Sequence, residues 1–501
     1  MRRLRKAYLV PLFCGALLLS ACGTRPLGGS IGSGSTAPLT LAITAPFTLG
    51  ITNNPPAGVT VLSFQITITG AVLQPGNVSL INSPVTVELT QLQTDNDLLA
   101  SLSVPAGNYT SLALTFANPD MTIFNGSVPG LTNCAVGAFC EFAPVLSVTS
   151  ITLTPALTLT SDTPEAIEIA FSVNDSLQSD LSLDLTSGVT VEEPPSVTSD
   201  AVSFPLNTVA GVISQIGTNQ FTLNTLEGAS LTVDTTTSTL FSFPSTVCAA
   251  DDATCLATGE IISADMIVLG SGAIQANMII FEDNSGDPGI QGTIVALNLA
   301  ASPPQLSIVI HGQAPATTGV AIDNLATVSL QNLTTYAVDA DVLTIPSGFT
   351  FASTADLVVG QEVLVRGNTI TVTPVSGEPN QIAISTDQLI LRQSQWTANV
   401  DLIDEGNSAF SLTSLPDLFT SLAPTPINSL YVTTSAVTEF NFSNLTSLSA
   451  GTSLSVKGLV FNNTSNEAAS PSDVASIVTG APDLTQPAGA AGRGAMTSHS
   501  R

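Results

Sequence analysis

Alternation of apolar and polar residues, repeating every two positions, is the feature that most restricts the fold of this 501-residue chain. The clearest examples are residues 62–69 and 167–174, where Leu, Ile, Val and Phe alternate with mainly polar residues. Alternating segments separated by Gly, Pro and Asn clusters predict half-buried strands. No sustained helical stripe occurs, and the helix-favouring residues Glu, Lys and Arg are scarce. We therefore expect an all-β fold.

The first domain is expected to span residues 38–196. It ends at Glu192-Glu193-Pro194-Pro195, where two consecutive prolines exclude a central strand. Many short strands usually form two packed sheets, so we predict a β-sandwich of immunoglobulin-like or transthyretin-like type.

A weak internal repeat follows the sandwich. Its closing ends agree best: residues 357–367 and 448–458 each have Leu, Gly three residues later, alternating apolar positions and a basic residue before a final Gly. Residues 264–272 match less well in the first unit. This pattern is typical of a turn glycine that feeds a strand. We expect three related small β-barrels, joined end to end as separate units, at residues 205–286, 288–392 and 394–463. Three segments open these units, Gly211-Val212-Ile213, Gly292-Thr293-Ile294 and Trp396-Thr397-Ala398-Asn399-Val400.

The N-terminus has the features of an exported precursor. Four basic residues precede an apolar run, Tyr8 to Leu19, that is too short to span a bilayer. The run ends in Leu19-Ser20-Ala21-Cys22, which resembles the lipobox of bacterial lipoproteins, whose cysteine is acylated and becomes the new N-terminus. The resemblance implies that residues 1–21 are a signal peptide, that Cys22 is lipidated, and, because Gly23 follows, that the protein is sorted to the outer membrane. An ordinary signal peptide that contains a cysteine is the alternative.

Composition also marks both ends of the mature chain. Residues 22–37 are rich in Gly and Ser, which predicts a flexible tether between the lipid and the first domain. Residues 464–501 are rich in Ala, Gly, Ser and Pro with little periodicity, which predicts a disordered tail.

The charge balance is strongly acidic, with 10 basic and 38 acidic residues. Loss of the signal peptide removes four of the basic residues and leaves a net charge of −32. Phosphate recognition depends on Lys and Arg, so we expect no nucleic-acid partner. Only 10% of the residues are charged and 44% are hydrophobic, which separates the chain from acidic disordered proteins.

Two segments suggest families. The segment Val104-Pro105-Ala106-Gly107-Asn108-Tyr109, together with the alternation that follows it, resembles a family of uncharacterised lipoprotein domains from environmental bacteria. The repeats resemble a second uncharacterised family that often follows the first. These resemblances imply architecture and location but transfer no chemistry. From the residues alone, Pro105 and Gly107 close a turn, and the Tyr109 hydroxyl is expected to find a backbone partner at a sandwich edge.

Catalytic chemistry has few candidates. His311 ends an apolar run, and the second histidine, His499, lies in the tail. A serine or cysteine triad would need His311 as its base, but one strand-end histidine is more often a hydrogen-bonded structural residue. We therefore expect no catalytic residues and no enzymatic activity.

The sequence evidence for a metal site or a sugar-binding site is equally weak. No His/Cys cluster has zinc spacing. Residues 283–287 place Asp283 and Asp287 as oxygen ligands at alternating positions, as calcium loops do, but a plain turn is the preferred interpretation. We expect no metal and no cofactor. A sugar platform would need exposed aromatic rings, whereas Trp396, which opens a repeat, is expected to anchor a core.

Four cysteines remain besides Cys14 in the signal peptide and the lipidated Cys22, and four cysteines allow three pairings. We predict the two local disulfides, Cys134–Cys140 and Cys248–Cys255, because the domain boundary lies between the pairs and exported proteins favour structural disulfides.

Together these features predict a non-enzymatic, lipid-anchored cell-envelope protein that serves as a structural or adhesive surface module. Its partners would be the membrane, through the N-terminal lipid, and an extracellular glycan or protein. An extracellular carbohydrate- or ligand-binding module is the alternative, and an envelope hydrolase is the third possibility.

Overall fold

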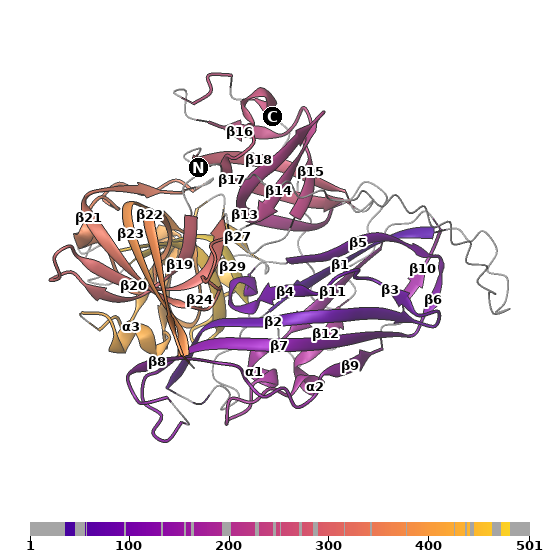
Figure 1. Ribbon diagram of the computed structural model, residues 1–501, viewed down its shortest axis with the longest axis horizontal. Helices are drawn as coiled ribbons and strands as arrows, with labels where there is room; N and C mark the ends of the chain where they lie inside the picture. Colours follow the sequence, from indigo (N-terminus) through magenta and orange to yellow (C-terminus); the bar gives the residue numbers. More distant parts are fainter. Residues whose placement is uncertain are drawn as a thin grey trace, which may run out of the picture. The chain divides into compact units, whose positions relative to one another are not determined.

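The computed structural model describes residues 36–45, 56, 58–94, 97–131, 134–154, 157–161, 165–192, 202–225, 230–243, 247–250, 252–269, 273–283, 289–314, 316–340, 343–376, 378–424, 426–435, 438–440, 445–462 and 472–480. The prediction of an all-β protein is confirmed, since strands dominate and the α-helices described are four or five residues long (Figure 1). Within these residues no helix has the length and apolar character needed to cross a membrane. The predicted signal peptide, Cys22 and the Pro194-Pro195 boundary lie outside the described residues.

The N-terminal domain consists of two main sheets and a short ribbon. One sheet has the order β12 (Val189–Glu192), β11 (Glu165–Phe171), β1 (Thr36–Thr44) and β5 (Asp97–Pro105). The other has the order β3 (Val78–Ser79), β2 (Val59–Gln74), β7 (Ser111–Asn125) and β8 (Ala138–Phe142), with β4 (Val85–Glu88) paired to β2 and β9 (Ser150–Leu153) to β7. The ribbon joins β6 (Gly107–Tyr109) to β10 (Leu157–Leu159). β2 and β7 run side by side along the second sheet (Figure 1).

The two main sheets share one hydrophobic core. Phe171 of β11 packs edge-on against Phe64 of β2 and Phe116 of β7, with ring centroids 5.9 and 6.3 Å apart. Two four-residue helices, α1 (Val173–Ser176) and α2 (Leu185–Gly188), follow β11 and precede β12. Tyr109 is buried at the end of β6, and its hydroxyl donates to the Pro105 carbonyl oxygen at 2.8 Å. The expected backbone partner of this hydroxyl is therefore present, and we call this turn the Tyr109 corner. β1 begins at Thr36, two residues before the predicted start of the domain.

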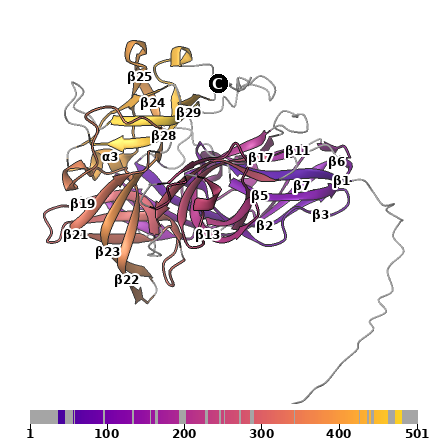
Figure 2. The same cartoon turned by 90° about the horizontal axis from the view of Figure 1, so that it is seen from above.

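Three rings of five strands follow. The first is formed by β13 (Val202–Gly217), β14 (Gln220–Thr225), β15 (Ser230–Asp234), β18 (Ile274–Asp283) and β17 (Ile261–Leu269). The second is formed by β19 (Gly289–Asn298), β20 (Gln305–Ala314), β21 (Leu325–Val338), β23 (Glu378–Arg392) and β22 (Glu362–Val375). The third is formed by β24 (Ser394–Asp404), β25 (Ala409–Thr413), β26 (Leu430–Thr433), β29 (Ser472–Gly480) and β28 (Ser453–Phe461), of which β24, β28 and β29 lie together in Figure 2.

All three rings have the same connectivity. The strands pair in the order first, second, third, fifth, fourth, and the third and fifth strands run parallel while other neighbours run antiparallel. This is a five-stranded Greek-key barrel of OB-fold type. Short β16 (Leu240–Ser242) and β27 (Glu439–Phe440) also pair with the fifth strands of the first and third barrels.

One glycine in each barrel occupies an equivalent turn before the fourth strand. Gly259, Gly360 and Gly451 have φ of +93°, +94° and +85°, a region that favours glycine. Each glycine N–H donates to a carbonyl of the first strand, on Ile213, Ile294 and Val400 respectively, at 2.7–2.8 Å. Each turn follows a 3₁₀ segment, at Ala253–Cys255, Thr354–Asp356 and Leu445–Ser447.

These equivalences correct two predictions. In the first barrel the counterpart of residues 357–367 is residues 256–266, eight positions earlier than residues 264–272, and it was missed because Asp265 and Met266 replace the basic residue and the final glycine. The tail predicted to be disordered from residue 464 contains β29, so the third barrel continues past residue 463. The composition did not indicate this strand, because Ser, Ala and Gly surround its few large apolar residues. The strand is stabilised by its pairing with β28 and β26.

The expectation of separate units is wrong for the second and third barrels. One hydrophobic cluster combines Leu62 and Phe124 of the sandwich, Val309 of the second barrel, and Trp396 and Phe410 of the third. Leu62 reaches this cluster because the register of β2 shifts between Val61 and Ser63, which turns it away from the sandwich core.

Both predicted disulfides are present. Cys134–Cys140 closes the loop that leads into β8, and Cys248–Cys255 closes the loop before the fourth strand of the first barrel, with Cα–Cα distances of 5.7 and 5.5 Å.

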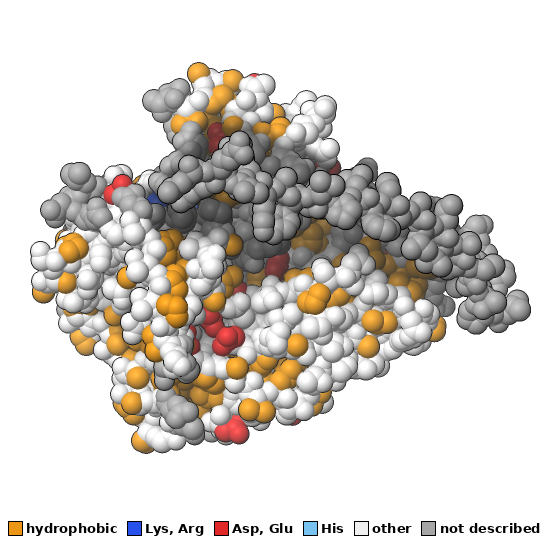
Figure 3. Space-filling view, viewed as in Figure 1, with side chains coloured by type: hydrophobic (Ala, Val, Ile, Leu, Met, Phe, Trp, Pro, Cys, Tyr) orange, Lys and Arg blue, Asp and Glu red, His pale blue; other side chains and the backbone are white. Residues whose placement is uncertain are grey.

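All three basic residues of the described part are buried. Arg366, Arg392 and Lys457 are at most 5% exposed. Arg392 bridges two barrels, because its guanidinium lies 3.0 Å from Glu282 of β18 and 3.1 Å from Asp339 after β21. On the face seen in Figure 3, acidic and basic side chains are few among the described residues, and hydrophobic side chains are scattered among the backbone and other side chains.

Candidate functional site

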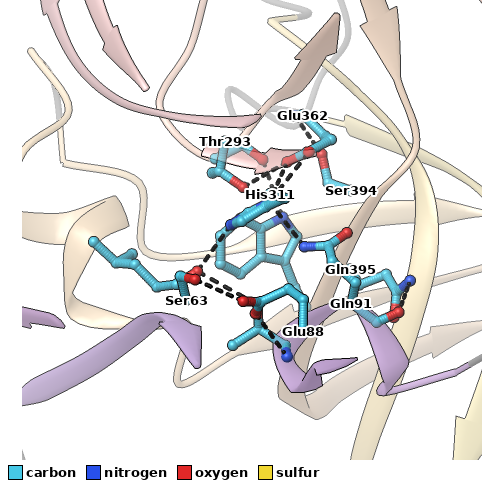
Figure 4. Close-up of polar contacts among 12 residues, drawn as sticks. Ser63, Glu88, Gln91, Thr293, His311, Glu362, Ser394 and Gln395 are labelled. Carbon is cyan, nitrogen blue, oxygen red and sulfur yellow. Dashed lines mark hydrogen bonds and ion pairs between the residues drawn. The ribbon is translucent and has the colours of Figure 1, made fainter. Parts of the chain in front are cut away.

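The one described histidine lies where three domains meet. His311 belongs to β20 of the second barrel and is 3% exposed. Its Nε2 is 2.9 Å from the carbonyl oxygen of Leu62 in the sandwich, and its Nδ1 is 3.2 Å from both carboxylate oxygens of Glu362 (Figure 4). The side-chain amide of Gln91, which follows β4 in the sandwich, lies 2.9 Å from the same Nδ1. Both ring nitrogens are therefore occupied by protein groups.

Glu362 is held in place by two barrels. It begins β22, next to the turn formed by Gly360, and its Oε2 accepts a hydrogen bond of 2.6 Å from Thr293 of β19. Its backbone N–H donates to Ser394 Oγ at the start of β24, at 2.8 Å. The neighbouring Gln395 donates from Nε2 to the Gln91 carbonyl oxygen at 2.8 Å, which links the third barrel to the sandwich.

A second buried carboxylate, Glu88, lies on the sandwich side of the junction (Figure 4). It ends β4 and caps the 3₁₀ segment Leu89–Leu92, because its Oε1 accepts from the Thr90 N–H at 3.1 Å. Its Oε1 also accepts from the Phe64 N–H, and its Oε2 accepts from Ser63 Oγ at 2.7 Å. Ser63 is thus bound to a carboxylate and not to the imidazole.

The electrostatics of this cluster favour a charged histidine. Burial alone lowers the pKa of His311, but the charge and hydrogen bond of Glu362, the charge of Glu88 and the Leu62 carbonyl together raise that pKa to about 9. A pKa of about 9 favours the protonated ring at neutral pH; its Nε2 donates to the Leu62 carbonyl and its Nδ1 to Glu362, with the oxygen of the Gln91 amide, and not its nitrogen, turned toward Nδ1. Such a ring holds a proton between domains and has no free nitrogen with which to act as a base.

A second polar cluster joins the sandwich to the turn before β21. Thr122 Oγ1 of β7 donates to the Asp323 carbonyl oxygen at 2.7 Å, and the Leu325 N–H donates to Glu141 Oε1 of β8 at 2.9 Å. Asp323 is 3% exposed, and its Oδ1 accepts from Asn324 Nδ2 at 3.3 Å. Burial and the charges of Asp120, Glu141 and Glu88 raise the pKa of Asp323 to about 8.

Of the other sequence candidates, Trp396 lies beside this junction, and the rest lie elsewhere or outside the described residues. Trp396 is buried as expected, and its indole N–H donates to the Gly360 carbonyl oxygen at 3.1 Å. Cys22, Asp287 and the Asp283 side chain lie outside the described residues. Among the described residues no group of three or more His, Cys, Asp and Glu side chains is arranged to hold a metal ion.

Sequence reasoning singled out His311 but missed its partners. Glu362 and Glu88 lie 51 and 223 positions away and were two among 38 acids. The sequence did contain one indication of Glu362. This residue stands two positions after Gly360, the glycine that recurs in each barrel. The equivalent positions are Ser453 in the third barrel and Ile261 in the first. A charged residue at a position that is uncharged in the other repeats indicates a contact particular to one barrel.

The comparisons with known proteins add no further assignment: the search against protein-family models and the search of curated proteins each found no match to this chain.

Proposed function

We propose that this protein is a non-enzymatic, lipid-anchored component of the bacterial cell envelope, with a folded part that serves as a structural or adhesive surface module. The observation that carries the proposal is the junction around His311. The side chains most suited to chemistry, those of His311, Glu362, Glu88 and Ser63, are buried and bonded to one another or to backbone groups. Their role is to join the sandwich to two barrels.

Export and anchoring are supported by two independent features. The first 22 residues have the order of a basic start, an apolar run and the lipobox-like Leu19-Ser20-Ala21-Cys22. The two disulfides are of the kind that persists in oxidising compartments outside the cytosol. A chain with more than one acyl group on Cys22 would be held firmly in the membrane. The resemblance of residues 104–109 to lipoprotein domains agrees with this location.

The alternative functions draw less support. A sugar platform needs aromatic rings on one exposed face, and the large hydrophobic side chains that are well exposed among the described residues are all aliphatic. A hydrolase centred on His311 would need a free ring nitrogen, and both nitrogens are occupied.

Metabolic labelling with a palmitate analogue tests the anchor. We expect wild type to carry label in the membrane fraction and Cys22→Ser to carry none. Cys14→Ser is the matched control, because this second cysteine of the signal segment lies upstream of the lipobox, and it should label like wild type. Label retained on Cys22→Ser would refute the lipoprotein assignment.

An array of glycans and envelope proteins, probed with the fragment from Thr24 onward, tests the surface role. Binding to a protein, or assembly of the fragment with itself, supports the structural or adhesive role. Selective binding to a glycan, reduced by substitution of the half-buried Tyr336 or Tyr431, would favour the alternative.

A further inference from the structure

The first strand of the sandwich lies inside its sheet and not at an edge. β1 follows the predicted tether directly in the sequence, and it is flanked by β11 on one side and by β5 on the other. Its residues 39–44 pair in parallel with residues 165–170 of β11, and its residues 36–43 pair antiparallel with β5. Removal of β1 from the sheet would therefore break two ladders of hydrogen bonds.

β1 is also buried on both of its faces. Leu39, Leu41 and Ile43 are fully buried in the core that the two main sheets share. On the other face Ala42 is fully buried as well, and it belongs to the core cluster of the first barrel. Extraction of the strand would expose these apolar side chains to water, which opposes it further.

The two ends of β1 lie at opposite ends of the sandwich. At the start of the strand, Thr36 pairs with Pro105, whose carbonyl oxygen accepts the hydroxyl of the Tyr109 corner. Just after the strand, the Ala45 N–H donates at 2.9 Å to the carbonyl oxygen of Leu92, in the 3₁₀ segment that contacts the second and third barrels. The nine residues of β1 span about 30 Å between these ends.

This orientation determines how a mechanical load would act on the strand. In a protein that is anchored through Cys22 and bound to a partner through its barrels, tension enters the sandwich at Thr36 and leaves it at the junction with the barrels. The load then runs along the axis of β1. Since ladder hydrogen bonds lie across this axis, they would resist the load together. A pull across the strand would instead break them one after another from Thr36.

We propose that β1 is the load-bearing strand of this protein, and that it makes the sandwich a mechanical link between the lipid anchor and the barrels. This inference deepens the proposed function and rests on it for the anchor at Cys22. It gives the sandwich the task of resisting tension and leaves contact with a partner to the barrels.

Single-molecule force spectroscopy tests the proposal by pulling the sandwich in two directions. The sample is the fragment from Thr24 onward, attached at its N-terminus and at one introduced thiol. That thiol is the only free one, because the four cysteines of the fragment form two disulfides. Pro129→Cys places it in the exposed loop after β7, at the junction end, and Thr152→Cys places it on β9 beside the start of β7, at the end of the Tyr109 corner.

The unfolding force should be several-fold higher for Pro129→Cys than for Thr152→Cys. The first direction loads both ladders of β1 together, whereas the second peels the strand away from Thr36. Neither attachment point lies in β1, so the comparison leaves the strand itself intact. Equal forces in the two directions, or a higher force for Thr152→Cys, would overturn the proposal.

Two substitutions in the shared core then test whether β1 is the strand that bears the load. Leu41 of β1 and Leu114 of β7 are both fully buried in this core, so Leu41→Ala and Leu114→Ala should both lower the urea midpoint. With attachment at Pro129→Cys, Leu41→Ala should lower the unfolding force far more than Leu114→Ala does. An equal loss of force in the two variants would contradict the role of β1.

Two further points keep the test decisive. If Leu41→Ala does not fold, the comparison of the two pulling directions still decides the proposal, because it needs no change in β1. Failure of the palmitate-labelling test would remove the anchor and leave the directional resistance in place. Equal forces would remove the load-bearing role and leave the anchor in place, so the two failures can be told apart.

Discussion

Gly360 of the second barrel lies against the ring of Phe419 in α3 (Asp417–Ser421) of the third barrel, so closely that an added Cβ would be 2.3 Å from the ring. The same glycine accepts the Trp396 indole N–H, and Trp396 packs edge-on against Phe419 at 4.9 Å. A turn that every barrel contains has therefore become a contact between two barrels.

Gly360→Ala should be far more damaging than the equivalent Gly451→Ala. Both glycines have positive φ, so alanine costs about 1 kcal/mol at either position. At Gly451 nothing lies within 4 Å of the added Cβ, whereas at Gly360 the clash with Phe419 adds a further 1–3 kcal/mol, roughly. Urea denaturation of both variants measures the difference, and equal losses would show that the contact with Phe419 does not bind the barrels together.

Tyr109→Phe should destabilise the sandwich by about 1 kcal/mol, because it removes the hydrogen bond to the Pro105 carbonyl while leaving the buried ring in place. Tyr431→Phe is the matched control. Its hydroxyl is 3.5 Å from Asp404 Oδ2, at the limit of a hydrogen bond, so the loss should stay below about 0.5 kcal/mol. Thermal unfolding followed by circular dichroism distinguishes the two. A larger loss at Tyr431 would contradict this assignment of the corner.

Asp473→Asn should stabilise the protein at pH 8 and change it little at pH 4. Asp473 of β29 is fully buried, and burial raises its pKa to about 7, against the opposing effect of the Val474 backbone N–H. A raised carboxyl pKa means that stability falls as the pH rises from about 4 to 7, by up to about 1.4 kcal/mol per pH unit. Asparagine does not ionise, so this part of the pH dependence should disappear. Denaturant unfolding at pH 4, 6 and 8 measures this pH dependence of stability, with the exposed substitution Asp401→Asn as the control. If Asp473→Asn leaves the pH dependence unchanged, Asp473 is not protonated in the folded protein.

Digestion with a Glu-specific protease should release the two disulfides in separate peptides. Residues 89–141 and 228–260 each lie between consecutive glutamates and each contain one pair. Mass spectrometry without reduction should find each peptide two hydrogens lighter than its free-thiol form. Peptides joined to each other would contradict the pairing.

Removal of the two disulfides should have unequal effects on the domain interface. By loop-closure entropy, each of these short loops stabilises the fold by about 2 kcal/mol. Cys134→Ser/Cys140→Ser should in addition lower the protection of the Leu325 amide from hydrogen exchange, because Cys140 lies in β8 next to Glu141, the acceptor of that amide. Cys248→Ser/Cys255→Ser is the matched control, and it should lose stability without this effect. Equal loss of protection in both double variants would show that the first disulfide has no special role in the interface.

The all-β fold, the corner at Tyr109, the burial of Trp396 and both disulfides could be predicted from the sequence because each depends on local patterns. Strand alternation, turn residues and short cysteine spacings act over fewer than ten positions. The position of β29 could not be predicted this way. Its large apolar residues are few, and its neighbours β26 and β28 supply the hydrogen bonds that make it a strand.

The junction was predictable only in part. His311 could be expected to be a hydrogen-bonded structural residue, but its partners are distant in sequence: Glu362 is on another strand of the same barrel, and Leu62 and Gln91 belong to the sandwich, 249 and 220 positions away. Leu62 illustrates the same limit. Its place in an alternating segment predicts a sandwich core residue, yet a register shift in β2 sends it into the cluster with Trp396. Contacts between domains depend on the shape and chemistry of the surfaces of the folded domains. A local sequence pattern does not determine whether two such surfaces are complementary.

The burial of Arg366, Arg392 and Lys457 has a consequence for resistance to proteolysis. Proteases of trypsin specificity cut after Arg or Lys, and the sequence has neither between Pro26 and Val365. In the described part of the chain the three remaining cleavage points are at most 5% exposed and lie within strands. The folded barrels would therefore resist this class of enzyme until one of them unfolds. Amine-directed reagents would likewise find no accessible lysine among the described residues.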